Sequence, residues 1–499
     1  MKGRRIEGIP SRLSARLCDV ETRLCPCPDL RRQVLDAGAN PVVLLWMDGL
    51  VDGVRLQNAV ETWRCARSAT RGRRTAGAST GGMAIPGVDT RVLADTDEVL
   101  TALSDGCAVC LTDKRPWAVA WDVSRRPGRA VDKPENEPTL QGPQEAFVES
   151  LSENFALLRK RLRRGGLRME GMQVGTRAPV RVGVMYVEGI ARPELVGEVR
   201  RRIRNIRTDT AIDLNVIREY VTDAPFSLFP TTEETERPER VAASLLQGRV
   251  GVMVDGAPNC MLVPVTFMMF LGSPEDYYMH FTMALPLRLL RHLMFWAAVL
   301  LPSLYVALLT YNQDLVPTPL LVSVAAQHAG IPFPTMVEAL GMMIAFEALR
   351  EAGTRLPRAV GQSVSIVGTL IIGDAAVRAG LVSPGMVIVV AATGVASFTL
   401  PALGLVQATR ILQFPFVVMA AVFGLYGVVL LGLVVVGHMA SLRSFGVPYL
   451  SPVAPHVGAD MKDVVIRAPW WAMRRRPRQF QTQDDTRANG RPLGRRVPW

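Results

Sequence analysis

Charged residues are distributed so unevenly along this 499-residue chain that their distribution restricts what it can fold into. Up to about Asp276 charges recur every few residues, from there to about Gly458 they become scarce, and beyond that the chain is polar and basic. Uncharged runs at 293–313 and 416–437 are each long enough, as a helix, to cross a bilayer. The pattern excludes a single soluble globule, a disordered chain and a fibre. It predicts a soluble N-terminal half, a membrane-embedded C-terminal part and a basic tail.

Two further apolar segments, 359–377 and 385–404, complete four expected membrane spans. The apolar segment 315–346 contains four prolines and Glu338, so we expect it to be broken or re-entrant. Both ends of the chain are expected on the cytoplasmic side, which needs an even number of crossings and favours discounting the broken segment. Discounting it leaves the arginines of the 350–358 loop outside, against the positive-inside trend, so the sequence leaves the number of spans open.

Apolar runs of strand length alternate with amphipathic helical patterns in the N-terminal half, which predicts two α/β subdomains. The basic N-terminus is not followed by the apolar stretch of a secretory leader, so we expect this half to stay in the cytoplasm. The predicted fold is multidomain, with two α/β cytoplasmic subdomains followed by an all-α transmembrane domain. Its parts are a first subdomain at 1–140 with an Arg/Gly-rich insertion at 64–92, a second at 141–275, the helical transmembrane domain at 285–445, and a basic, disordered cytoplasmic tail at 459–499.

The basic tail indicates a membrane partner. It carries ten Lys or Arg against four Asp, so its net charge is 10 − 4 = +6 within a chain of formal net charge +12. A basic segment beside a membrane span favours the cytoplasmic side and anionic lipid. No zinc-finger spacing or aromatic-basic recognition motif supports nucleic-acid binding. We therefore expect membrane lipid, and no nucleic acid, among the partners.

No catalytic motif is present in the sequence, so we expect no enzyme activity, no cofactor and no metal site. Cys107 and Cys110 form a Cys-x-x-Cys in an apolar run, without the second ligand pair that zinc requires, and are expected to be core residues. Glu233, Glu234 and Glu236 precede a predicted helix and are expected to form its solvated N-terminus.

Polar residues inside the apolar segments are the candidate functional residues, because they are costly there. Gln362, Ser365, Thr369 and Gly373 fall on one helix face and form a stripe of polar and small residues. The stripe is interpreted either as the lining of a conduit or as a helix-packing face, for which small residues are equally typical.

Three acidic residues lie inside the membrane part or at its edge. Asp374 is spaced to pair with Arg378 at i+4, and Glu347 can reach Arg350. Glu338 and Glu347 are nine residues apart, so they face opposite sides of a helix and cannot form one carboxylate pair.

Several irregular blocks resemble the A subunit of the GerA family of spore germination proteins. In the C-terminal half these are 330–338 (GIPFPTMVE), 346–357 (FEALREAGTRLP), 366–375, 380–384 (GLVSP), 396–398 and 441–452 (SLRSFGVPYLSP). In the N-terminal half they are 142–147 (GPQEAF) with Asn154 and Arg159, 235–238 (TERP), 248–250 (GRV), 255–258 (DGAP) and 275–278 (EDYY). The resemblance covers nearly all of 140–456. His328 and Ala329 depart from it, because the family usually has an Arg-Glu pair there.

The resemblance implies an integral protein of the spore inner membrane with its N-terminal domain in the cytoplasm. It implies a subunit that acts with B and C subunits as a nutrient germinant receptor and forms a homo-oligomeric ion conduit. Stage V sporulation protein AF is a close relative within the family, without a known nutrient. The alternatives are a membrane transporter and a non-conducting scaffold or signalling subunit.

Overall fold

The computed structural model describes residues 11–24, 29–36, 41–70, 83, 85, 87–113, 117–124, 134, 137, 139, 141–162, 166–355, 373–464 and 466–487. The chain divides into two compact units. The first, here called the sheet unit, is assembled from Met1–Asp223, Thr232–Pro264 and Met473–Trp499. The second, the helical unit, comprises Ala224–Thr231 and Val265–Ala472.

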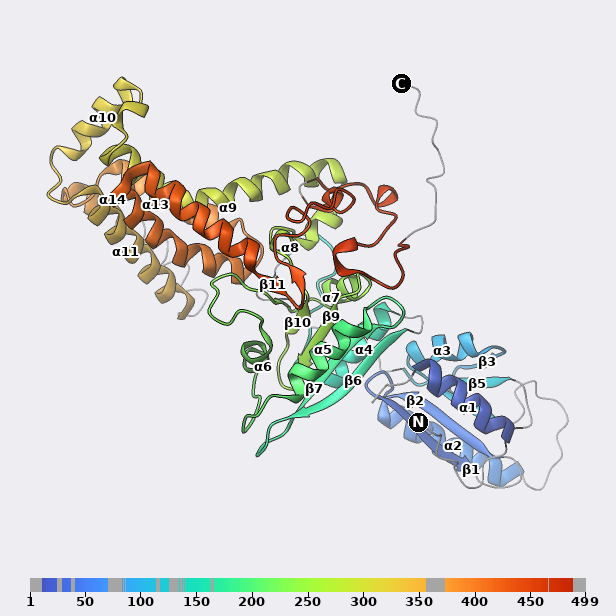
Figure 1. The fold of residues 1–499 in the computed structure, drawn as a ribbon. Coiled ribbons are helices and arrows are strands. Elements are labelled where there is room, and N and C mark those ends of the chain that lie inside the picture. The colour runs from blue at the N-terminus through green and yellow to red at the C-terminus, as the bar shows by residue number, and fades with distance from the viewer. Residues whose placement is uncertain are drawn as a thin grey trace. The chain divides into compact units, whose positions relative to one another are not determined.

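The first sheet of the sheet unit has five strands in the order β1-β2-β4-β5-β3, with every pair antiparallel. Its strands are β1 (Leu30–Asp36), β2 (Val42–Met47), β3 (Thr90–Leu93), β4 (Cys107–Thr112) and β5 (Ala118–Asp122), and its helices are α1 (Ser11–Leu24), α2 (Gly53–Thr70) and α3 (Thr96–Ser104). Side chains alternate along β4, so that Val109 lies in the core with α1 and α3 while Cys110 lies in the core with α2. Helices thus cover both faces of this sheet (Figure 1).

The second sheet is also five-stranded and antiparallel, in the order β6-β7-β9-β10-β8. Its strands are β6 (Leu167–Val174), β7 (Val180–Val187), β8 (Glu233–Thr235), β9 (Val250–Val254) and β10 (Cys260–Val263), and its helices are α4 (Leu151–Arg161), α5 (Pro193–Arg204), α6 (Leu214–Val221) and α7 (Pro238–Leu245). Phe155 of α4 packs on β7 where Gly183 leaves room, since a Cβ there would lie 2.4 Å from the ring. The predicted helix–strand alternation is therefore present, with purely antiparallel pairing.

The predicted solvated glutamate cluster is wrong at Glu233, which lies in β8 and is buried. Arg249 and Arg240 contact its two carboxylate oxygens at 2.6 and 2.5 Å. Burial acts to raise the pKa of Glu233, but the two guanidinium groups outweigh it and the net pKa is lowered. The sequence pattern failed here because it could not reveal that Arg240 and Arg249, which follow Glu233 outside β8, converge on this carboxylate.

The basic tail was predicted to lack regular structure, yet its described part contains three short 3-10 helices, Met461–Asp463, Trp470–Ala472 and Arg478–Phe480. The part from Met473 onward belongs to the sheet unit. There Phe480 is buried, Gln483 N–H donates to the Ile190 carbonyl at 3.1 Å, and Arg476 donates to the Leu246 carbonyl at 2.8 Å. Specific backbone contacts therefore order this part of the tail despite its polar composition.

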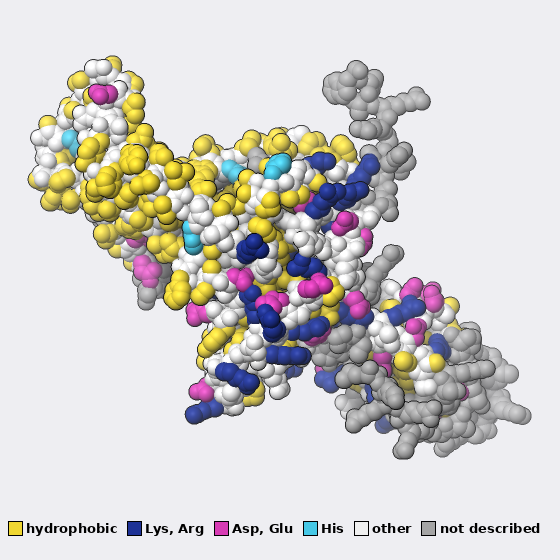
Figure 2. Space-filling view, in the orientation of Figure 1, with side chains coloured by type: hydrophobic (Ala, Val, Ile, Leu, Met, Phe, Trp, Pro, Cys, Tyr) yellow, Lys and Arg dark blue, Asp and Glu magenta, His cyan; other side chains and the backbone are white. Residues whose placement is uncertain are grey.

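The helical unit contains α8 (Phe267–Phe270), α9 (Phe281–Thr310), α10 (Thr318–His328), α11 (Thr335–Arg355), α13 (Pro384–Phe398) and α14 (Leu403–Ser441), a short β11–β12 hairpin (Arg443–Ser444 and Val447–Pro448), and two further 3-10 helices, Pro274–Tyr277 and Gln313–Leu315. Hydrophobic side chains cover the visible surface over the helices, whereas charged side chains gather over the sheet-containing part (Figure 2). Among the described residues, α9 and α14 are long and apolar enough to cross a membrane. The predicted break within 315–346 falls between α10 and α11.

Helix α14 is a hairpin of two arms, 403–423 and 425–441, that meet at Gly424. Gly424 has φ 60° and ψ −145°, a conformation open to glycine alone. The freed amide of Leu425 donates to the Asn312 side-chain oxygen at 3.0 Å. A straight helix of this length would be about 58 Å long, but Gly404 packs on Pro230 while His438 contacts Ser227 at 2.9 Å.

Both ends of α14 therefore lie at one end of the helical unit, here called its base, where Phe229, Phe267 and Tyr449 pack together. The C-terminal arm returns the chain to this base. The predicted single span at 416–437 is thus divided at Gly424 between the two arms.

Candidate functional site: buried charges of the helical unit

The predicted conduit stripe lies largely outside the described residues, which exclude Gln362, Ser365 and Thr369. Gly373 is described and buried, and a Cβ there would lie 3.6 Å from a methyl group of Val387 in α13. The interpretation of the stripe as a conduit lining stays a prediction.

Glu338 is the centre of the first polar cluster. It lies in the first turn of α11 with a fully buried side chain, and its Oε1 accepts hydrogen bonds of 2.5 Å from the backbone N–H and the hydroxyl of Ser383 at the start of α13. Its Oε2 lies 3.2 Å from His328 Nε2 of α10. The buried hydroxyl of Tyr305, in α9, lies over Gly385 next to this cluster. Three described elements thus converge on one carboxylate.

His328 lies between the backbone of its own helix and Glu338. Its Nδ1 is 3.1 Å from the carbonyl of Val324, a geometry that fits an Nδ1–H donor. Its Nε2 faces Oε2 of Glu338 at 3.2 Å. The contact therefore links the end of α10 to the first turn of α11.

Glu347 is the centre of the second cluster, nine residues further along α11 and on the opposite face of the helix. It pairs with Arg350 at 3.2 Å, as the sequence spacing predicts, and with Arg410 of the first arm of α14. The Arg350 guanidinium stacks between Phe346 and Phe398, at 4.9 and 5.0 Å from the ring centroids. One carboxylate and two arginines leave this cluster with a net charge of +1.

Asp374 differs from the two glutamates because it is exposed. It pairs with Arg378 at 2.8 Å, which confirms the predicted i, i+4 contact. The side chains of Asp374 and Arg378 remain 55% and 79% exposed, so their pairing is worth well under 1 kcal/mol if water surrounds it. As predicted, Glu338 and Glu347 do not meet and contact different partners.

Sequence reasoning missed His328 and Arg410 as members of these clusters. A signal for Arg410 exists, since it is the only Asp, Glu, Lys or Arg between residues 379 and 442. His328 carried a weaker signal, as a departure from the family pattern. Its distance of ten residues from Glu338 is bridged by the turn between α10 and α11.

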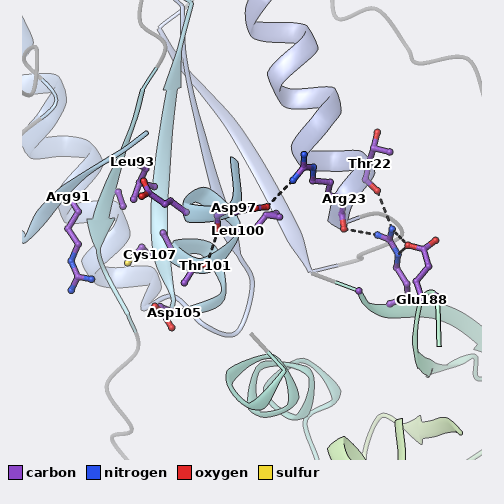
Figure 3. Close-up of a pocket in the computed structure, with 16 residues that line it drawn as sticks. Thr22, Arg23, Arg91, Leu93, Asp97, Leu100, Thr101, Asp105, Cys107 and Glu188 are labelled. Carbon is purple, nitrogen blue, oxygen red and sulfur yellow. Dashed lines mark hydrogen bonds and ion pairs between the residues drawn. The ribbon is translucent and has the colours of Figure 1, made fainter. Parts of the chain in front are cut away.

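The sheet unit contains a cleft of about 980 Å³ between α1, α3 and the start of β6 (Figure 3). Arg23 pairs with Asp97 at 2.9 Å, and the buried Arg168 binds Glu188 and the carbonyls of Thr22 and Arg23. These charged groups therefore already pair with other groups of the chain. Among the described cleft residues, none presents a buried polar atom that lacks a partner.

Within the part of the chain that the structure describes, no three His, Cys, Asp or Glu side chains form a group that could hold a metal ion. Cys107 and Cys110 are buried in β4, as expected for core residues.

These features define a class of protein with two antiparallel α/β subdomains and a helical unit that carries buried ion pairs and helices apolar enough to cross a membrane. The family model for the Bacillus/Clostridium GerA spore germination protein matches residues 19–479. The chain therefore belongs to the GerA family of spore germination proteins.

The chain is also similar to individual proteins of Bacillus species. The chain is 41% identical over 391 residues to spore germination protein KA of Bacillus subtilis, covering 78% of this chain and 72% of that protein. It is 41% identical over 399 residues to the uncharacterized membrane protein YfkQ of Bacillus subtilis, covering 80% and 77%. It is 32% identical over 457 residues to spore germination protein XA of Bacillus anthracis, covering 92% and 93%. The crystal structure of the N-terminal domain of the A subunit of the Bacillus megaterium germinant receptor GerK3 matches 53% of this chain and 99% of that one, with 22% identity and a TM-score of 0.41.

Proposed function

We propose that this chain is the A-type membrane subunit of a spore germinant receptor and that it conducts ions when partner subunits bind a nutrient. In this proposal the helical unit spans the spore inner membrane, with the sheet unit in the cytoplasm. B and C subunits and further copies of the chain complete the receptor.

The observation that carries the conduction proposal is the pair of charge clusters around the buried Glu338 and the partly buried Glu347. Ionisable groups inside a membrane are costly and are retained where they serve an ion or substrate path. Each cluster joins side chains of different helices, namely α10, α11 and the N-cap of α13 for Glu338, and α11 and α14 for Glu347. A shift of α11 relative to α13 would break the hydrogen bonds of Glu338 with Ser383, and a shift relative to α14 would break the Glu347–Arg410 pair, so the clusters favour a small number of discrete helix arrangements.

Nutrient binding would act by population shift. A partner subunit whose bound form favours the broken arrangement would expose Glu347 and the two arginines to water and open a polar path. To move the closed-to-open ratio from 99:1 to 1:99, the bound partner must favour the open form by about 5.5 kcal/mol. Disruption of one or two partly buried ion pairs is of this order.

Ion flux from proteoliposomes containing the whole receptor tests the proposal. Thr369→Leu, which places an apolar side chain on the predicted stripe, is expected to abolish nutrient-triggered flux while the protein level stays normal. Val429→Leu on an exposed apolar position of α14 is the control and should conduct as the parent does. Unchanged flux in Thr369→Leu would count against the conduit and for the scaffold alternative.

A transporter is the second candidate, because α14 is interrupted at Gly424 and the α10–α11 connection breaks another apolar segment. Interrupted helices are typical of transporter binding sites. Flux that saturates with one substrate, in a monomer or dimer, would favour this alternative over an oligomeric ion conduit.

A further inference from the structure

The first part of α9 presents its apolar face outward and its arginines inward. Exposed apolar side chains recur at helical spacing at Met283, Leu287, Leu290, Leu293 and Trp296. Arg288 and Arg291 point the other way and are covered. This is the reverse of a soluble surface helix, so the outward face requires an apolar cover.

Arg288 and Arg291 are neutralised by a built network. Both donate to the buried carboxylate of Asp276, at 2.9 and 2.8 Å, and Arg288 also pairs with Asp463 at 3.1 Å. The hydroxyl of Tyr277 donates to the other oxygen of Asp463 at 2.7 Å. The two nearby carboxylates, Asp276 and Asp463, are therefore already paired with Arg288, Arg291 or Tyr277.

Arg467 is a third arginine beside this network, and it has no carboxylate partner among the described residues. Arg467 is 3% exposed, and its guanidinium lies 5.3 Å from the centroid of Tyr277, whose ring also lies 5.5 Å from Arg288. Its Nε is buried and has no hydrogen-bond partner, and its other polar contact is a long one of 3.4 Å to the Met279 carbonyl. No carboxylate of the described chain forms an ion pair with it. Burial lowers the pKa of this guanidinium, as expected for a covered cation.

Exposed aromatic and aliphatic side chains flank Arg467. Ile466, Trp470 and Trp471 are 57, 49 and 50% exposed, and Trp470 packs on Tyr277 with centroids 5.5 Å apart. Tryptophan is enriched where a protein meets the membrane–water boundary. The contact between Arg467 and the Met279 carbonyl places the guanidinium just before α9 begins at Phe281.

We propose that Arg467 binds the phosphate of an anionic phospholipid whose chains cover the apolar face of α9, with Trp470 and Trp471 at the headgroup level. The unpaired guanidinium supplies the charge complement, and the outward face of α9 supplies the apolar surface that acyl chains cover. This inference rests on the proposed membrane location of the helical unit but not on ion conduction.

The test is lipid retention by the purified full-length protein, measured by native mass spectrometry with phosphatidylglycerol, phosphatidylcholine or inorganic phosphate as the probe. The parent is expected to prefer phosphatidylglycerol over phosphatidylcholine. Arg467→Gln should weaken phosphatidylglycerol binding by about tenfold or more, since charge-assisted hydrogen bonds are lost. Arg443→Gln, at an exposed arginine of the same unit, is the matched control and should behave as the parent does.

Two further measurements keep the test decisive. Trp471→Ser should weaken both lipids while keeping the preference for phosphatidylglycerol, because the charge is intact. Arg467→Gln should unfold no earlier than the parent in lipid-free detergent, since it removes an unpaired buried cation. Undiminished phosphatidylglycerol binding by Arg467→Gln would overturn the proposal. Displacement of the lipid by millimolar inorganic phosphate would also overturn it, in favour of a free-anion site. Failure of the parent to enter lipid nanodiscs would instead count against the proposed membrane location.

Discussion

Replacing Gly424 with alanine tests the hairpin of α14 most directly. A non-glycine residue at φ 60° and ψ −145° carries backbone strain of about 1–3 kcal/mol. The new Cβ would lie 2.8 Å from the side-chain oxygen of Asn312 and 2.9 Å from Cβ of Tyr311, and such overpacking costs about 1–3 kcal/mol more. We therefore expect Gly424→Ala to lower the free energy of unfolding by about 2–6 kcal/mol.

Gly432 is the matched control. It lies in the second arm of α14, and a Cβ there would meet nothing within 4 Å. In a helix interior alanine is more favourable than glycine by about 1 kcal/mol, so Gly432→Ala should stabilise the protein slightly. The same substitution at two positions eight residues apart is thus expected to change the free energy of unfolding in opposite directions.

Thermal unfolding of the full-length protein in detergent measures both variants. At about 2–4 °C per kcal/mol for a unit of this size, Gly424→Ala should unfold roughly 5–20 °C below the parent, and Gly432→Ala a few degrees above it. If both variants unfolded at or above the temperature of the parent, α14 would be a continuous helix and the hairpin would be refuted.

Three further predictions concern the side chains of Glu347, Asp29 and Cys107. Glu347→Gln leaves two arginines facing one another, and we expect about 1–3 kcal/mol of destabilisation, since these side chains are partly exposed, together with altered ion flux. Asp29→Ala removes the carboxylate that pairs with the buried Arg159 and should cost about 3–5 kcal/mol in denaturant titrations, whereas Asp48→Ala in an exposed pair should cost under 1 kcal/mol. Burial raises the pKa of Cys107 to about 11, so only about one thiol in a thousand is ionised at pH 8. Alkylation of Cys107 should therefore be far slower than that of the exposed thiols of α1 and α2, and an equal rate would contradict its burial.

Local periodicity predicted the central strands of the sheet unit well. The apolar runs 106–112 and 117–123 have the length of strands and are β4 and β5, which pair with one another, and the alternating segment 180–187 is β7. Strands at the sheet edges were missed because their side chains are not uniformly apolar. β1 reads Leu-Arg-Arg-Gln-Val-Leu-Asp, and most of its side chains lie exposed or half-buried.

The charge clusters were predicted only where partners are close in sequence. The pairs Glu347–Arg350 and Asp374–Arg378 follow from one helical turn of spacing. The contact of Glu338 with Ser383 joins residues 45 positions apart and depends on how α11 packs against α13. Similarly, the hairpin at Gly424 could not be predicted, because an uncharged apolar run has the same composition whether it is straight or folded back.

The sheet unit is completed by a segment that follows the helical unit in the sequence. The helical unit is inserted between Pro264 and Met473, and the segment after Met473 then adds Phe480 and Gln483 to the sheet unit. During synthesis, this segment therefore reaches the sheet unit only after all the apolar helices have left the ribosome. The carbonyls of Ile190 and Leu246 receive their hydrogen bonds only after Arg476 and Gln483 have been synthesised. Synthesis of the sheet unit thus finishes after that of the helices, although most of its residues precede them in the sequence.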